Sequence, residues 1–188
     1  MIKLLEFNQF LTVLGYKEVK ILSVKNFLNK VRKKTNNIPL QIFDANCIAG
    51  EKHVLFATLN ALNAFKQKRN VSKSIEVEIL IYASGQRQIA KAIEMIGLKE
   101  ETSEIAVAFI TIKEDDIQKI QDDVSAIVSG RRDDRIIGFQ KHKPKKIIEV
   151  YNITNLDRNG LLNTTTSFWD ALVANIIEKT AMLAIKHK

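Results

Sequence analysis

Apolar residues recur every three or four positions along much of this chain, a spacing that predicts amphipathic helices. A helix beginning at Glu51 has one apolar face over about four turns, formed by Val54, Leu55, Thr58, Leu59, Leu62 and Phe65. An acidic helix from Glu114 to Ser129 has the stripe Ile117, Ile120, Val124 and Ile127. After Gly85, a further helix that ends at Gly97 has the apolar positions Ile89, Ile93, Ile96 and Leu98. These segments are expected to pack on a common core through one face each.

Three other segments are predicted to be strands. Ile105 to Ile112 is almost continuously apolar, which is typical of a central strand covered on both faces. Leu40 to Phe43, directly after Pro39, predicts a short strand, and Ile147 to Ile153 is a further candidate. A sheet flanked by helices therefore accounts for the pattern from residue 39 onward.

The N-terminal region is harder to interpret. Ile2 to Tyr16 mixes β-branched, aromatic and polar residues without a clean period, and Val19 to Val24 could form a strand. Ser23 could then cap a basic helix that ends near Lys33 and has Phe27, Leu28 and Val31 on its apolar side. Residues 1–38 are accordingly treated as an N-terminal extension of uncertain structure.

The segment Ser74 to Ala83 fits two periods. Its branched aliphatic residues alternate with Glu76, Glu78, Leu80 and Tyr82, as in a strand. Ser72 or Ser74 could instead cap a helix, because Ile75, Ile79 and Tyr82 share a helical face. Periodicity alone favours the strand slightly.

The last helix, opened by Ser167 with Asp170 as a variant capping box, is unusually apolar. One wide stripe consists of Trp169, Leu172, Val173, Ile176, Ile177, Thr180, Leu183 and Ala184. A second edge consists of Phe168, Ala171, Met182 and Ile185. Either the helix is sunk in the core of its own chain, or part of it, such as Phe168 or Met182, contacts another protein. Before it, Asn155 to Gly160 reads as a turn or a short helix.

Composition narrows the class of protein. A chain of 188 residues with 46% hydrophobic and 27% charged residues suits one globular domain. The net charge of +8 favours a polyanionic partner. The single Cys47 cannot form an intrachain disulfide, and no apolar run approaches the ~20 residues of a membrane span. We therefore expect a soluble, cytoplasmic protein without a membrane partner.

Candidate chemistry is concentrated at two predicted helix starts. Gln86-Arg87-Gln88 offers forked donors and amide groups that suit nucleic acid or another chain. The polar triplet could equally cap backbone groups and pair Arg87 with a carboxylate. Lys52 and His53 lie in the first turn of another helix, where exposed backbone N–H groups favour an anion.

Signatures of catalysis and of metal binding are missing from the sequence. The histidines are scattered, and the chain has no Gly-rich phosphate loop, nucleophile elbow or Cys/His ligand pair. The basic stretch from Arg131 to Lys146 is an exposed loop or a nucleic-acid contact. The residues alone therefore indicate a basic α/β binding protein that is not an enzyme and uses no cofactor.

Two blocks of the sequence resemble a known family. Residues 43–57, Phe-Asp-Ala-Asn-Cys-Ile-Ala-Gly-Glu-Lys-His-Val-Leu-Phe-Ala, and 74–97, which contain Tyr-Ala-Ser-Gly-Gln-Arg-Gln-Ile-Ala-Lys-Ala-Ile, are similar to the two signatures of the archaeal and eukaryotic PRPK-binding-protein family. The final helix resembles the C-terminal segment of the family more loosely. The likeness is firm over about residues 40–112, and the extension and the basic stretch match less well.

The resemblance, in its archaeal form, implies an accessory subunit of the KEOPS (EKC) complex, which modifies tRNA to N6-threonylcarbamoyladenosine. Family members are not the catalyst. They bind the kinase-like ATPase subunit of the complex and help to bind tRNA, including its single-stranded 3′ end. The family fold is a single α/β (α+β) domain with a small mixed sheet packed among helices, and it would make Ser74 to Ser84 helical.

On this basis the chain is expected to form one domain over 1–188, with a family core at 39–130, a basic loop at 131–146, and a strand plus helix at 147–188. The two helix starts would converge as a tRNA-binding surface formed by Lys52, His53, Gln86, Arg87, Gln88 and Lys91. The kinase-like partner would contact Phe168, Met182 and Ile185. The alternative is a free-standing basic α/β domain that binds RNA or senses a small ligand.

Overall fold

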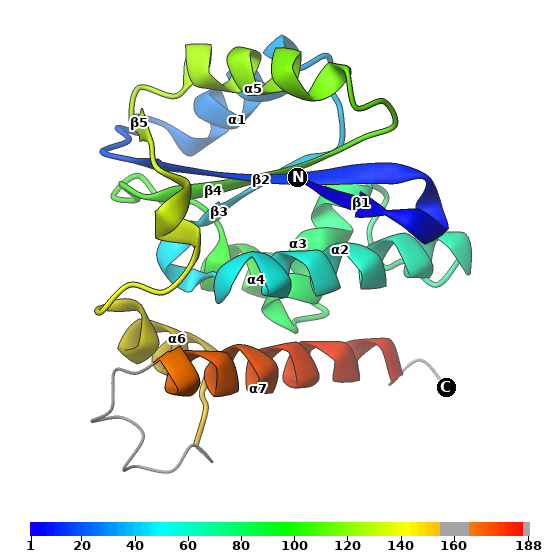
Figure 1. Ribbon diagram of the computed structural model, residues 1–188, viewed down its shortest axis with the longest axis vertical. Helices are drawn as coiled ribbons and strands as arrows, with labels where there is room; N and C mark the ends of the chain where they lie inside the picture. The colour runs from blue at the N-terminus through cyan, green and yellow to red at the C-terminus, as the bar shows by residue number, and fades with distance from the viewer. Residues whose placement is uncertain (155–165, 186–188) are drawn as a thin grey trace.

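The computed structural model describes residues 1–154 and 166–185, of which 166, 167 and 185 are described by their backbone only. A sheet lies between two helical layers (Figure 1). Helices α1 (Val24–Lys34) and α5 (Asp116–Ile127) cover one face. Helices α2 (Gly50–Lys66), α3 (Ile75–Ser84) and α4 (Ile89–Ile96) lie on the other, with α6 (Lys143–Tyr151) and α7 (Thr166–Ile185) beyond them. The single α/β domain with a small sheet among several helices is confirmed, but the sheet is antiparallel in all its described pairs and not mixed as expected.

The described strands pair only in the antiparallel sense. Their order is β1 (Ile2–Leu4), β2 (Gln9–Lys17), β4 (Ile105–Thr111) and β3 (Leu40–Asp44), and β5 (Arg131–Arg132) pairs with the end of β2. All seven residues of β4 are buried, since β4 lies between two strands and two helical layers. The predicted strands at 40–43 and 105–112 are thus confirmed, the second as the centre of the sheet.

The two faces of β4 differ in side-chain size. Val107 and Phe109 pack toward α1 and α5, whereas Ala106 and Ala108 pack toward α2 and α3. Helix α2 in turn buries small side chains, Ala57, Ala61 and Ala64, together with Val54 and Thr58. Small side chains allow close packing in this layer, where α2 contacts mainly α3 and α7.

The N-terminal region is not an appendage. Strand β2 pairs with β4 over seven registered positions, from Phe10 with Thr111 to Tyr16 with Ile105. No strand is found at 19–24, where a turn leads into α1, and the Ser23 hydroxyl accepts from the N–H of Asn26 as predicted. Strand β2 was missed because Thr12, Gly15 and Tyr16 interrupt its apolar pattern, although all three are buried or closely packed.

The predicted strand at 147–153 is wrong, because these residues belong to α6. Pro144 sits in its first turn, and Ile147 and Tyr151, four residues apart, are buried on one face. The run of β-branched residues imitates a strand, and packing against the core decides for the helix. The stretch 131–146 is likewise not one loop, because it contains β5, the 3₁₀ turn Asp134–Ile137 and the start of α6.

Residues 75–84 form a helix, so the expectation from the family resemblance is confirmed over that from periodicity. Seven of its ten residues are buried, which leaves no amphipathic period to detect. Glu78 is fully buried and accepts hydrogen bonds from the backbone N–H groups of Val71 and Ser72 and from the Ser72 hydroxyl. Gly85 ends the helix with φ +66°, a left-handed conformation that favours glycine. The expectation for Asn155 to Gly160 lies outside the described residues. The backbone of Ser167 lies inside α7, which begins at Thr166, and the cap expected from its side chain lies outside the description.

Candidate functional site

A buried histidine joins the start of α2 to the end of α3. The Nδ1 atom of His53 accepts from the backbone N–H of Ala49 at 3.2 Å, so Nε2 carries the proton and donates to the carbonyl of Ala83 at 2.8 Å. The Tyr151 hydroxyl donates to the carbonyls of Cys47 and Ala83, and its ring lies edge-on to His53 at 5.6 Å. The first turn of α2 therefore lies beside the turn that leads into α4.

These contacts remove His53 from the predicted tRNA surface. The side chain is fully buried, and both ring nitrogens have partners within the protein. Burial lowers the pKa of His53 to about 4, so the ring is neutral at physiological pH. His53 is a structural anchor, and a histidine in a first helical turn gave no sequence signal for that.

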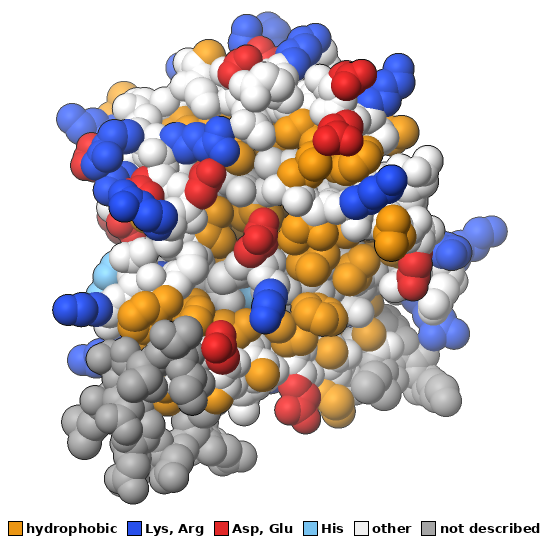
Figure 2. Space-filling view, in the orientation of Figure 1, with side chains coloured by type: hydrophobic (Ala, Val, Ile, Leu, Met, Phe, Trp, Pro, Cys, Tyr) orange, Lys and Arg blue, Asp and Glu red, His pale blue; other side chains and the backbone are white. Residues whose placement is uncertain are grey.

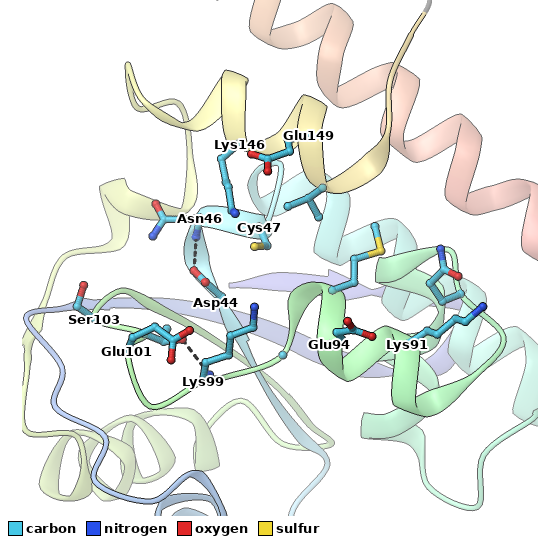
Figure 3. A pocket seen from close by; sticks show the side chains of 15 residues that line it. Asp44, Asn46, Cys47, Lys91, Glu94, Lys99, Glu101, Ser103, Lys146 and Glu149 are labelled. Atoms are coloured by element: carbon cyan, nitrogen blue, oxygen red, sulfur yellow. Dashed lines mark hydrogen bonds between the residues drawn. The ribbon is translucent and has the colours of Figure 1, made fainter.

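A cavity of about 650 Å³ opens beside α4 (Figure 3). Its walls come from the end of β3, α4, the loop 97–103 and α6. Lys91, Lys99 and Lys146 reach it from three different segments, and its acidic residues are Asp44, Glu94, Glu101 and Glu149. A mixed lining of this kind suits a ligand that offers both negative groups and hydrogen-bonding edges.

Polar contacts hold one end of the cavity in place. The Asp44 carboxylate accepts from the N–H of Asn46 at 2.9 Å, and the Asn46 side-chain oxygen accepts from Nε2 of His142 at 2.8 Å. A smaller adjoining cavity shares Asp44, Asn46 and Lys146 and adds His142 and Glu104. We call the two together the α4–α6 cleft. Burial raises the pKa of the Cys47 thiol at its floor to about 12, so the thiol is not an activated nucleophile.

The predicted tRNA-contacting residues are placed differently. Gln86 and Lys91 line the α4–α6 cleft. Lys52, Arg87 and Gln88 are exposed, Lys52 in the first turn of α2 and the other two in the turn before α4. Gln88 is the N-cap residue of α4, but its side chain makes no capping hydrogen bond. The sequence gave no reason to include Asn46, Lys99 or Lys146, because they come from distant segments that meet only in the fold.

The comparison with known proteins bears on this arrangement. Residues 16–182 match the family model described as kinase binding protein CGI-121. The chain belongs to the CGI-121 family. The family resemblance noted in the sequence is therefore confirmed.

Curated members of the family align over much of the chain. The regulatory protein Cgi121 of Methanocaldococcus jannaschii is 32% identical over 151 residues, 80% of this chain and 87% of that protein. The EKC/KEOPS complex subunit CGI121 of Candida glabrata is 22% identical over 86% of this chain and 91% of its own length. The KEOPS complex subunit Cgi121 of Pyrococcus abyssi is 42% identical over 60 residues, 32% of this chain and 33% of that protein. The match to the family model includes most of the segment 1–38 that was expected to lie outside the family core.

Hydrophobic side chains gather at the surface between the sheet and α7 on the face seen in Figure 2. On α7, Met182 is 45% exposed and Phe168 is half-buried, while the side chain of Ile185 lies outside the description. On α4, Ile89 and Ile93 are 39% and 49% exposed although the sequence placed them on a core-facing stripe. The end of α3 lies near α7, because a Cβ built on Gly85, which follows α3, would be 3.5 Å from Cγ2 of Thr180 in α7.

Two further findings concern only residues 1–154 and 166–185. Within them, no group of three or more His, Cys, Asp and Glu side chains is arranged to hold a metal ion. None of the helices in this part of the chain is long and apolar enough to cross a membrane.

Proposed function

We propose that this protein is a non-catalytic accessory subunit of a KEOPS complex that binds the kinase-like ATPase subunit and the 3′ end of tRNA. The observation that carries the proposal is membership of the CGI-121 family, whose curated relatives are named as KEOPS or EKC/KEOPS subunits. Cysteine often acts as a nucleophile in enzymes and histidine as a base, but Cys47 and His53 are both buried in this protein.

The tRNA role is assigned to the α4–α6 cleft and the exposed turns beside it. Lys91 and Lys146 supply positive charge, and Gln86 supplies an amide that can pair with the edge of an unstacked base. Lys52, Arg87 and Gln88 extend the surface toward solvent. Unpaired bases suit such a cleft because their edges are free for hydrogen bonding.

Two pairs of lysine substitutions test whether tRNA binding depends on the cleft. Lys91→Gln with Lys146→Gln should weaken tRNA binding and lower the slope of log K against log salt by about 1.4, from roughly 0.7 per lost contact with a single strand. Lys113→Gln with Lys119→Gln removes two exposed lysines elsewhere and should leave the slope unchanged. Binding curves are measured by fluorescence anisotropy with intact tRNA and with tRNA that lacks its 3′ single strand. Equal loss in both double variants, or equal affinity for both RNAs, contradicts the assignment.

The kinase-like partner is assigned to the apolar residues exposed on α7 and α4. Met182→Glu and Ile93→Glu each place a charge on a side chain about half exposed, so both variants should fold. A charge in the interface should abolish co-purification of the kinase-like subunit. Retained binding in both variants, once circular dichroism shows native spectra, rejects both helices as the docking surface.

A further inference from the structure

The positive charge of this chain is concentrated in one segment. Residues 19–43 contain six basic and no acidic residues, while the rest of the chain contains 23 basic and 21 acidic residues. This segment therefore holds +6 of the net charge of +8. Its basic residues are Lys20, Lys25, Lys30, Arg32, Lys33 and Lys34.

Helix α1 presents this charge to solvent. Its apolar side, including Phe27 and Val31, packs into the core, and its cations are exposed. Lys34 pairs with Asp123 of the acidic helix α5 at 3.5 Å. Helical spacing places Lys25 and Arg32 on the flank of α1 opposite Lys34. It places Asn29 and Lys33 on the outer side, away from the core. We call Lys25, Asn29, Arg32 and Lys33 the α1 ridge, which is about 12 Å long at 1.5 Å per residue.

The segment that leads into α1 passes beside the α4–α6 cleft. The backbone N–H of Val19 donates to the carbonyl of Ser103 at 2.9 Å, and Ser103 lines the cleft. Figure 3 shows Ser103 at the edge of the cleft farthest from Lys91. The chain then passes from Val19 through the exposed Lys20 to the start of α1. A ligand that leaves the cleft past Ser103 thus meets Lys20 first and the ridge next.

We propose that the α1 ridge is a second RNA contact, which binds the phosphate backbone of the strand whose end occupies the α4–α6 cleft. This inference rests on the proposed tRNA function and extends it to a separate surface. A row of cations without a carboxylate among them suits a phosphate backbone, and the amide of Asn29 between them can contact phosphate or ribose oxygens. Cations of this kind fix position and affinity without reading sequence.

A charge-matched pair of triple variants tests the proposal in the full-length protein. The ridge variant carries Lys25→Gln, Arg32→Gln and Lys33→Gln. The control variant carries Lys68→Gln, Arg69→Gln and Lys73→Gln, which are exposed residues in the connection between α2 and α3. Both variants lose two lysines and one arginine, so a general effect of net charge is equal in the two.

The ridge variant should bind tRNA on the order of 100-fold more weakly at about 0.1 M salt, with a salt slope lower by about 2 to 3. The control should change little, and both should unfold at the wild-type denaturant concentration because the substitutions are on the surface. A short RNA with the sequence of the 3′ end alone should discriminate less between the two variants than intact tRNA does, since it lacks the adjoining backbone.

Three outcomes overturn the inference. If ridge and control variants bind tRNA equally while the Lys91 and Lys146 double variant fails, the proposed function stands and the α1 ridge is not a contact. If the wild-type protein does not bind tRNA, both proposals fall together. If the ridge variant, or a Leu22→Ser variant at the 95% exposed residue before α1, loses the kinase-like subunit but keeps tRNA, the surface belongs to a protein partner.

Discussion

The starts of α2 and α4 look alike in sequence and behave differently in the structure. Each has a glycine at or shortly before its start, Gly50 for α2 and Gly85 for α4, and each places long polar side chains in or before its first turn. At α2 the side chain of His53 turns inward and is bonded at both ring nitrogens, whereas at α4 Arg87 and Gln88 face solvent. The difference comes from α6, because Tyr151 covers the α2 start. One helix start is thus a structural joint and the other a surface available to a ligand.

Substitutions at the starts of α2 and α4 should differ most in their effect on the stability of the protein. His53→Ala leaves the buried N–H of Ala49 without its partner and opens a cavity, so the free energy of unfolding should fall by about 3 kcal/mol. Gln88→Ala at the exposed start should change it by less than about 0.5 kcal/mol. Urea denaturation measures both. Similar small losses in the two variants would mean that His53 is not an anchor.

An acid titration of stability should reveal the same joint. The pKa of His53 falls from its usual 6.5 to about 4 in the folded protein, so the unfolded chain binds the proton more readily between these values. Stability therefore decreases as the pH falls from 6.5 to 4, by up to about 3 kcal/mol from this residue, and the contribution is fully present above pH 6.5. Between pH 6.5 and 4, the urea midpoint should change less with pH for His53→Gln than for wild type. A control with Gln88→Ala, which removes no titratable group, should keep the wild-type slope.

A smaller effect is expected at the turn that separates α3 from α4. Gly85 has φ +66°, and a Cβ there would make only ordinary contact with Thr180, so Gly85→Ala has a conformational cost of about 1 kcal/mol. Gly85→Asn should cost less, because asparagine tolerates the left-handed region better. Thermal unfolding ranks the three proteins. An alanine variant as stable as wild type would show that the turn readily adopts another conformation.

The smallest effect on stability should come from Lys52→Gln combined with Arg87→Gln, since both side chains are exposed. Its consequence is expected in tRNA binding instead, where each lost phosphate contact lowers the salt slope by roughly 0.7 to 0.9. Filter binding at several salt concentrations measures the slope. Unchanged affinity and slope would leave the open helix start without a role in RNA binding.

Whether an element could be predicted from the sequence depended on its environment in the fold. Helices α1 and α5, each with one face exposed to solvent, and the central strand β4 were predicted with their core residues. Helix α3 is buried on nearly all sides, so its own period could not identify it and only the family resemblance did. Strand β2 and helix α6 were missed or misread because their packing partners lie far along the chain.

The candidate site followed the same rule. Gln86 and Lys91 stood out because they closely follow Gly85, a glycine between two apolar segments, and both line the cleft. The cleft also contains Asn46, Lys99 and Lys146 from other segments of the chain. No local sequence pattern predicts that these segments come together in the fold. His53 was misjudged because exposure cannot be read from a first-turn position when a later helix covers it.

Gly15 in β2 has a consequence for how this protein avoids unwanted self-association. Its N–H donates to the Asp134 carboxylate at 2.9 Å, and its carbonyl accepts from the N–H of Asp133 at 2.8 Å. Any Cβ at this position would lie 2.6 Å from the Asp133 carbonyl oxygen. With β1 pairing one end of β2 and residues 131–134 latched on the other, the outer margin of that strand has little backbone left to template an intermolecular ladder. A larger residue at position 15 would displace residues 133–134 and expose backbone groups of β2 that could pair with a strand of another chain.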